Sequence, residues 1–147
     1  ISDNMKPPDW VTEALRYVAG GSGTATWIGT LPIAPSKDIS DNSFKLEWKK
    51  ELAQTVPSVF KRKPRLATAR ELLDATKEIS KDCENFDAPF LIMHGLADKV
   101  TSPEMSQFFY DTSKSKDKEI KLYDGMWHTI TSGEPDENID LVFKDAI

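Results

Sequence analysis

Hydrophobic residues in the second half of the chain follow the alternating strand and helix order of parallel sheets. Residues 89–94 form a continuous apolar run between a proline and a glycine, which predicts a strand covered on both faces. Residues 103–114 carry apolar side chains at helical spacing behind a Ser-Pro start, and residues 118–123 alternate, which predicts a helix and a second strand. A last helix opens at Pro135, with acids in its first turn.

The first half of the chain is less regular. Asp9 is suited to cap a short amphipathic helix that a Gly-Gly pair ends, and residues 22–36 show no sustained period, which predicts a loop. Residues 42–56 are expected to hold one or two helical turns. Residues 64–81 carry an apolar stripe among good helix formers, which predicts a longer helix.

The two patterns divide the chain into two regions. Residues 1–84 are interpreted as an irregular, mostly helical region, and residues 85–147 as part of an α/β core. Two strands do not form a stable α/β domain, so we expect them to belong to a larger parallel sheet with strands from outside this chain. The first residue is Ile1 and not a methionine, which fits a chain that begins within a longer protein. The missing N-terminal half of the fold is therefore an expected partner.

One ionisable side chain follows each of the two predicted strands. Asp98 comes after the first strand and His128 after the second. A right-handed crossover makes the strands neighbours, so their carboxyl ends share one sheet edge at a spacing of roughly 4.8 Å. Open α/β sheets bind their ligands at this edge. We therefore expect a hydrogen bond between the carboxylate and the imidazole.

Such a pair suits nucleophilic catalysis with a serine. His128 would take the proton from the nucleophile and return it to the leaving group, while Asp98 would hold the imidazole in one tautomer. In the structural alternative, Asp98 is a turn residue and His128 faces solvent, but their paired positions after successive strands favour catalysis. A G-x-S-x-G nucleophile motif is missing. The nearest match surrounds Ser22, lacks the final glycine and follows a helix, so we interpret it as a helix end.

Other candidate chemistry is limited. His94 ends a buried strand and is expected to be a hydrogen-bonded structural residue. His94, Asp98 and His128 have no recognised ligand spacing, so no metal is expected, and no cofactor is expected either. Cys83 is the single cysteine, which excludes an internal disulfide and favours a reducing compartment.

Composition adds few constraints. The 147 residues are 39% hydrophobic and 29% charged, which suits one globular domain. The formal charge of -5 weighs against nucleic acid as a partner. The apolar runs are far shorter than the roughly 20 residues of a membrane-spanning helix. No secretory signal is visible, so we expect a cytoplasmic location.

Three segments of the chain carry a family resemblance. They are residues 90–101 (FLIMHGLADKVT), 120–128 (IKLYDGMWH) and 131–140 (TSGEPDENID). They resemble the plant monoacylglycerol lipase-like hydrolases, the group that includes caffeoyl shikimate esterase. The resemblance implies an α/β-hydrolase whose cap covers the site, with Asp98 as triad acid and His128 as base. The catalytic serine and the oxyanion-hole motif of that group have no counterpart here, so this chain alone is expected to be inactive.

The resulting hypothesis is a C-terminal portion of an α/β-hydrolase fold, a parallel sheet with flanking helices preceded by a mostly helical cap. The parent protein would be a serine hydrolase that cleaves a small carboxylic ester, such as a monoacylglycerol or a related lipid. The cap would provide any peripheral contact with internal membranes. The alternative is a non-catalytic module that binds a small molecule or a partner on the same scaffold. A serine elbow upstream of this chain would favour the enzyme, and its replacement would favour the binding module.

Overall fold

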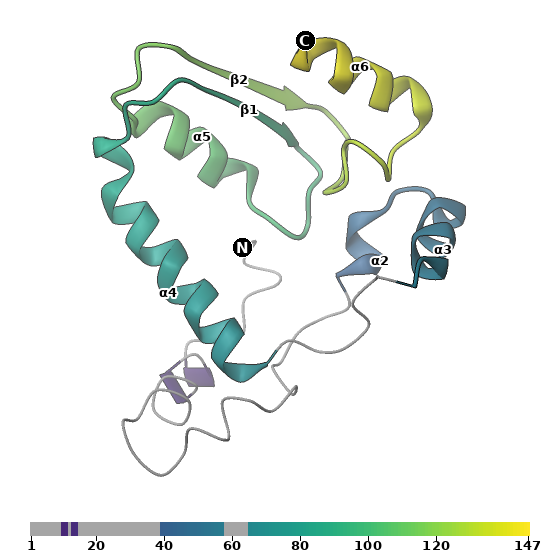
Figure 1. The fold of residues 1–147 in the computed structure, drawn as a ribbon, viewed down its shortest axis with the longest axis horizontal. Helices are drawn as coiled ribbons and strands as arrows, with labels where there is room; N and C mark the ends of the chain where they lie inside the picture. Colours follow the sequence, from purple (N-terminus) through teal and green to yellow (C-terminus); the bar gives the residue numbers. More distant parts are fainter. Residues whose placement is uncertain (1–9, 12, 15–38, 58–64) are drawn as a thin grey trace. The chain divides into compact units, whose positions relative to one another are not determined.

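The computed structural model describes residues 10, 11, 13, 14, 39–57 and 65–147 (Figure 1). Residues 10, 11, 13 and 14 are helical, in agreement with the helix expected after Asp9. The remainder of that helix, the loop expected at residues 22–36 and Ser22 lie outside the described residues.

Two parallel strands, joined by a helix, form the centre of the larger compact unit. Strands β1 (Phe90–Gly95) and β2 (Lys118–Tyr123) pair with Phe90 opposite Lys118 and Gly95 opposite Tyr123. Helix α5 (Pro103–Thr112) connects them, and the Ser102 hydroxyl accepts a hydrogen bond from the Met105 amide at 3.4 Å as its N-cap. The predicted parallel strand pair and its crossover helix are therefore confirmed.

An aromatic cluster packs α5 against one face of the strand pair. The rings of Phe86, Phe90 and Phe109 lie with their centroids 5.1–5.7 Å apart. Offset and edge-on contacts of this kind stabilise aromatic pairs beyond their buried area. These contacts fix α5 against the strand pair. They thereby also fix where the loop between β1 and α5 ends.

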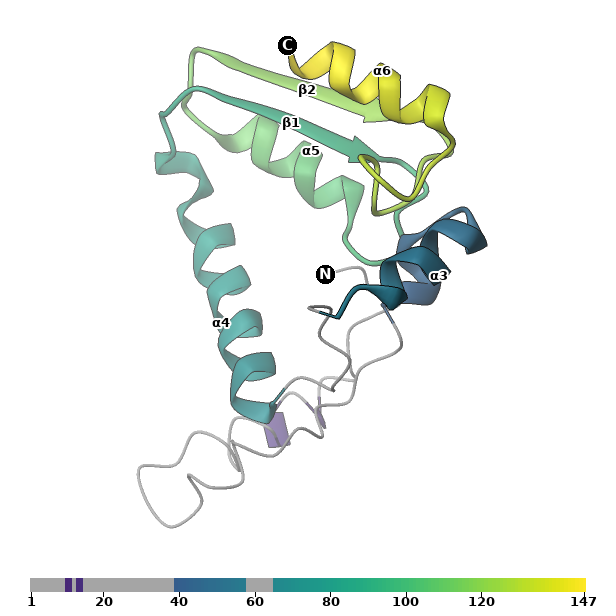
Figure 2. The same ribbon diagram turned by 45° about the vertical axis from the view of Figure 1, so that its right-hand side comes forward.

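Helix α6 (Asp136–Ala146) covers the opposite face of the strand pair (Figures 1 and 2). The Lys121 ammonium and the Tyr123 hydroxyl donate hydrogen bonds to Asp145 of α6 at 3.0 and 2.9 Å. Beside them, the buried side chains of Tyr123, Met126 and Val142 form a hydrophobic cluster. The last helix predicted from the apolar stripe after Pro135 is confirmed.

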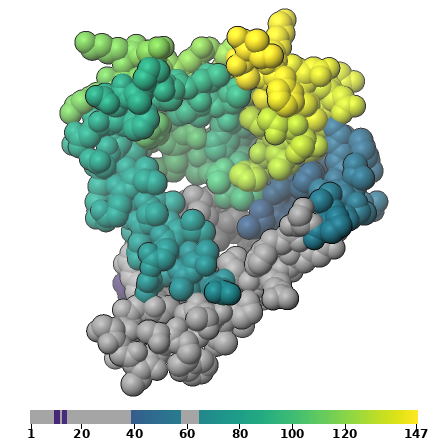
Figure 3. All heavy atoms as spheres, in the orientation of Figure 1, coloured from purple at the N-terminus to yellow at the C-terminus, as the bar shows by residue number. Residues whose placement is uncertain are grey.

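Residues 39–57 belong to the same compact unit as the strands, which comprises residues 1–5, 38–59 and 83–147. They form helices α2 (Ser40–Ser43) and α3 (Glu47–Thr55); α3 lies within residues 42–56, where the pattern predicts helical turns, and α2 begins two residues before them. The amides of Lys45 and Leu46 donate hydrogen bonds to the Gly133 carbonyl at 3.0 and 3.2 Å. This segment therefore lies against residues 124–135, which we call the histidine loop; Figure 3 shows the two segments in contact.

Helix α4 (Leu66–Asp82) belongs to the second compact unit, residues 6–37 and 60–82, and confirms the helix predicted there. Of its apolar stripe only Leu66 is buried, and Leu72 and Ile79 are exposed. A 3-10 turn, η2 (Cys83–Asn85), follows in the first unit. The division of the chain at residue 84 stays a prediction. In the described part of the chain, no helix combines the length and apolar character needed to cross a membrane.

Candidate active site

The carboxylate of Asp98 is fixed by its own loop. Its Oδ1 accepts hydrogen bonds from the amides of Val100 and Thr101 at 2.7 and 3.0 Å, and its Oδ2 accepts one from the Thr101 hydroxyl at 2.6 Å. The side chain is only 2% exposed. These three donors make the position of the carboxylate independent of the imidazole that it contacts.

The two loops that leave the strand ends are held to each other through their backbones. The Ala97 amide donates a hydrogen bond to the Met126 carbonyl at 2.9 Å. Gly95 allows this close approach, because a Cβ at that position would lie 2.7 Å from the Met126 carbonyl carbon and from the Trp127 oxygen. Gly125 turns the chain with a positive φ of 67°, a conformation that glycine adopts without strain. The backbone thus brings the two loops into register.

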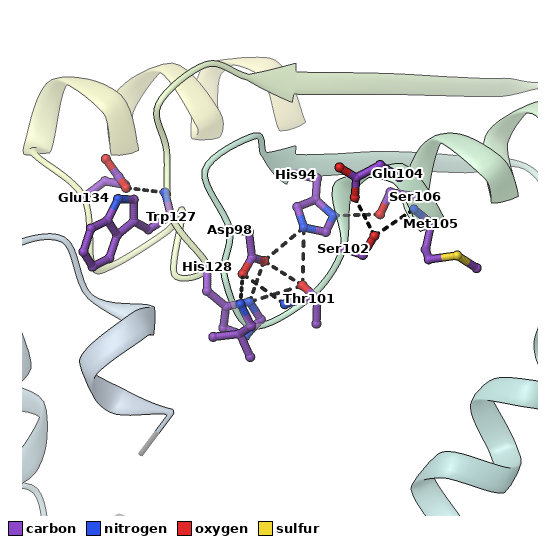
Figure 4. Close-up of polar contacts among 11 residues, drawn as sticks. His94, Asp98, Thr101, Ser102, Glu104, Met105, Ser106, Trp127, His128 and Glu134 are labelled. Atoms are coloured by element: carbon purple, nitrogen blue, oxygen red, sulfur yellow. Dashed lines mark hydrogen bonds and ion pairs between the residues drawn. The ribbon is translucent and has the colours of Figure 1, made fainter. Parts of the chain in front are cut away.

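His128 meets Asp98 at this junction (Figure 4). Its Nδ1 lies 2.8 Å from Asp98 Oδ2, and its side chain is 33% exposed. Because the Asp98 carboxylate accepts a hydrogen bond from Nδ1–H, the neutral imidazole carries its proton on Nδ1. This leaves Nε2 as the basic nitrogen. Within the described residues, no protein atom forms a hydrogen bond with Nε2. The ring therefore presents a basic atom away from the carboxylate.

Asp98 is an ionised carboxylate at neutral pH. Burial alone would raise its pKa, but the hydrogen bonds from Thr101, His128 and the Val100 amide outweigh burial and lower the pKa to about 2. An ionised carboxylate at hydrogen-bond distance stabilises an imidazolium. The pair can therefore accept a proton at His128 Nε2 and hold it during a reaction.

His94 contacts the same carboxylate, which the sequence did not indicate. Its Nε2 lies 3.0 Å from Asp98 Oδ2, and its Nδ1 lies 2.7 Å from the Ser106 hydroxyl oxygen. Facing a carboxylate, Nε2 donates, so in the neutral ring Nδ1 accepts the Ser106 proton. The hydrogen-bonded role expected for His94 is present. Its partner is Asp98, four residues further along the chain, because the loop that carries Asp98 turns back towards the end of β1.

Glu134 is a second buried carboxylate near His128, and sequence reasoning gave it no role. It is fully buried, and its Oε1 accepts a hydrogen bond from the Trp127 amide at 2.6 Å. Its Oε2 accepts one from the Asn138 amide group at 2.9 Å and lies 3.6 Å from the Lys45 ammonium. Its position directly before a helix start resembles that of ordinary first-turn acids, so no sequence signal marked it.

Among the described residues, no group of three or more His, Cys, Asp or Glu side chains is arranged to hold a metal.

The fold and the site together define a class of protein. Parallel strands joined by a helical crossover place an aspartate and then a histidine at neighbouring carboxyl ends, in the chain order of the α/β-hydrolases. The described part thus has the architecture of part of an α/β-hydrolase fold, with an aspartate and a histidine in contact at neighbouring strand ends.

Comparison with known proteins gives the family. The chain belongs to the family described as serine aminopeptidase, S33, whose profile matches residues 5–136. It is 36% identical over 145 residues to caffeoylshikimate esterase from Arabidopsis thaliana, which covers 99% of this chain and 42% of that protein. It is 44% identical over 59 residues to monoglyceride lipase from Saccharomyces cerevisiae, which covers 40% of this chain and 19% of that protein. The resemblance to monoacylglycerol lipase-like α/β-hydrolases is therefore confirmed.

Solved structures agree on the fold. The monoacylglycerol lipase of Paleococcus ferrophilus superimposes with a TM-score of 0.78 at 22% identity, over 96% of this chain and 51% of that one. A soluble variant of the Saccharomyces cerevisiae monoglyceride lipase gives a TM-score of 0.73 at 22% identity, over 94% of this chain and 47% of that one. The chain thus has the α/β-hydrolase fold and spans about half the length of these proteins or less.

Proposed function

We propose that Asp98 and His128 are the acid and the base of a Ser-Asp-His triad that hydrolyses carboxylic esters. The observation that carries the proposal is the 2.8 Å contact between His128 Nδ1 and Asp98 Oδ2, with Nε2 left for the reaction. This chain supplies the C-terminal part of the fold, and the nucleophilic serine comes from the rest of the parent protein. The 42% coverage of the plant relative and a sheet of only two described strands support this division.

In the proposed mechanism, His128 carries the proton through both halves of the reaction. Its Nε2 removes the proton from the serine hydroxyl as the oxygen attacks the ester carbonyl, and it then protonates the departing alcohol. Water, deprotonated by the same nitrogen, attacks the acyl-enzyme, and the proton then passes from Nε2 to the serine oxygen as the bond to the acyl group breaks and the acid is released. Asp98 remains ionised throughout and stabilises the imidazolium, as its low pKa requires.

The proposed substrate is a small ester, a monoacylglycerol or a related lipid ester. The family description names a peptidase, whereas the relatives named above are an esterase and a lipase. This supports ester hydrolysis over amide hydrolysis. Contact of the cap with a membrane surface, from which a lipid ester would be taken, forms part of the same proposal.

Two substitutions in the intact parent protein test the triad. His128→Ala should lower kcat by several orders of magnitude, and Asp98→Asn by roughly 10⁴-fold through the wrong imidazole tautomer. Asp124→Asn is the matched control, because Asp124 is an exposed acid of the histidine loop. Hydrolysis of a monoacylglycerol and of an aryl ester is measured for all three, with circular dichroism to verify folding.

Rates of both site variants within tenfold of wild type would refute the assignment. An inactive wild-type parent that still binds a monoacylglycerol, with binding unchanged in His128→Ala, would favour the non-catalytic binding module.

A further inference from the structure

The buried carboxylate of Glu134 is unusual because it lies inside the loop that carries His128. A buried carboxylate is costly unless it is paired and hydrogen-bonded, and Glu134 has both kinds of partner. The Trp127 amide and the Asn138 side chain each donate to one of its oxygens, and the Lys45 ammonium lies 3.6 Å away. Its burial is therefore compensated by contacts within the histidine loop, α6 and the α2–α3 segment.

One of these contacts ends directly beside the proposed base. The Trp127 amide is the peptide group that precedes His128 by one residue, and its 2.6 Å bond to Glu134 joins the two sides of the histidine loop (Figure 4). A hydrogen bond to an ionised acceptor is about twice as strong as one between neutral groups. Within the span that it closes, the Gly133 amide also donates to the Thr129 carbonyl at 2.7 Å. The backbone around His128 is thus fixed from inside the loop.

Lys45 brings the counter-charge from a distant part of the sequence. Besides approaching Glu134, its ammonium donates a hydrogen bond to the Gly125 carbonyl at 2.8 Å. It therefore contacts both the beginning and the end of the histidine loop. The Lys45 side chain is 35% exposed, so its ion pair with Glu134 has one partly solvated and one buried member.

We propose that Glu134 is a positioning residue for His128 and that Lys45, which also contacts the Gly125 carbonyl, helps to hold the Glu134 carboxylate in this place. The inference rests on the proposed function, because it assigns a role in holding the base of the triad. With the carboxylate removed, the Trp127 amide loses its acceptor, and the imidazole is free to move away from Asp98. Misplacement of a catalytic group by about 1 Å can cost roughly 100-fold in rate.

Three variants of the intact parent protein test this role, each with the fraction of active enzyme titrated by a fluorophosphonate probe. Glu134→Ala should lower kcat per labelled site by about 100-fold with KM within about threefold of wild type. Glu134→Gln should retain kcat within about tenfold, because the carboxamide oxygen still accepts from the Trp127 amide. Lys45→Met should fall between the two.

Matched controls separate positioning from a general change of charge. Glu137→Gln removes an exposed acid from the first turn of α6, and Lys50→Met removes a cation that pairs with Asp41 and Glu47 instead of Glu134. Both should keep kcat within about twofold, as is usual for surface substitutions.

A proton NMR spectrum gives a readout that does not depend on turnover. The downfield resonance of the His128 Nδ1 proton, held between two heavy atoms 2.8 Å apart, should weaken or shift upfield in Glu134→Ala and return in Glu134→Gln. If His128→Ala proves active, the proposed function fails, but the His128 resonance of the wild type and of the Glu134 variants still reports whether Glu134 positions the ring. Wild-type kcat and an unchanged resonance in Glu134→Ala would overturn the proposal. If that variant does not fold, Lys45→Met takes its place: a lowered kcat with a weakened resonance would support the proposal, and wild-type kcat with an unchanged resonance would overturn it.

Discussion

Replacing Gly95 by alanine should separate the two loops that carry Asp98 and His128. The added Cβ would lie 2.7 Å from the Met126 carbonyl carbon, whereas ordinary van der Waals contacts begin at 3.4 Å. The atoms nearest to this Cβ belong to the backbone carbonyl groups of Met126 and Trp127, which cannot rotate away as a side chain can. The Met126 carbonyl oxygen would lie closer still, so the histidine loop must move by at least the difference, roughly 0.7 Å, for the alanine to fit.

The cost of this movement follows from the contacts that it breaks. The hydrogen bond from Ala97 to Met126, now 2.9 Å, would stretch to about 3.6 Å or more and be lost, at about 1 kcal/mol. Overpacking adds about 1–3 kcal/mol. The Asp98 to His128 bond would lengthen by a similar distance, which should lower kcat by up to about 100-fold.

The assay compares Gly95→Ala with Gly125→Ala in the intact parent protein. No atom lies within 4 Å of a Cβ at Gly125, so that substitution costs only the strain of its positive φ, about 1–2 kcal/mol. Urea unfolding gives the free energies, and aryl ester hydrolysis per probe-labelled site gives kcat. Equal kcat in the two variants, with Gly95→Ala no less stable than Gly125→Ala, would refute the argument that Gly95 sets the spacing of the loops.

Three further predictions follow from the core, the acid and the rest of the fold. Val142→Ala, which truncates a fully buried side chain of α6, should lower the free energy of unfolding by about 1–3 kcal/mol and leave kcat unchanged; unaltered urea unfolding would contradict the packing. Because folding lowers the pKa of Asp98 from 3.8 to about 2, its stabilisation is complete above pH 3.8 and is lost as the pH falls towards 2. The difference in unfolding free energy between wild type and Asp98→Asn should shrink over that interval, and a constant difference would refute it. The 147-residue chain alone should neither hydrolyse an aryl ester nor react with a fluorophosphonate probe, and labelling at Ser22 would show that the nucleophile lies in this chain.

The strands and the proximity of Asp98 to His128 could be predicted because each depends on local pattern and on one topological rule. The apolar run at 89–94 and the alternation at 118–123 mark two strands, and a helical crossover then makes their carboxyl ends neighbours. The apolar stripe of α4 gave the helix correctly, although Leu72 and Ile79 are exposed. Periodicity indicates which residues share a helix face and does not indicate what covers that face.

The surroundings of the candidate site depend on contacts that no local pattern carries. The meeting of His94 with Asp98 requires the turn in which Asp98 accepts from the amides of Val100 and Thr101. The buried Glu134 carboxylate is paired with Lys45, which lies 89 positions earlier in the sequence. Long-range pairs of this kind are decided by tertiary packing.

The contact between residues 43–49 and the histidine loop has a consequence for recombining hydrolases. A chimera that joins a foreign N-terminal part to this chain at residue 83 would keep Asp98, His128 and both described strands, yet would lose the Lys45 ammonium and the amides that bind the Gly133 carbonyl. A junction placed before residue 39 would transfer all of these groups together. The exchangeable block for grafting Asp98 and His128 onto another scaffold therefore begins well before the strands that they follow.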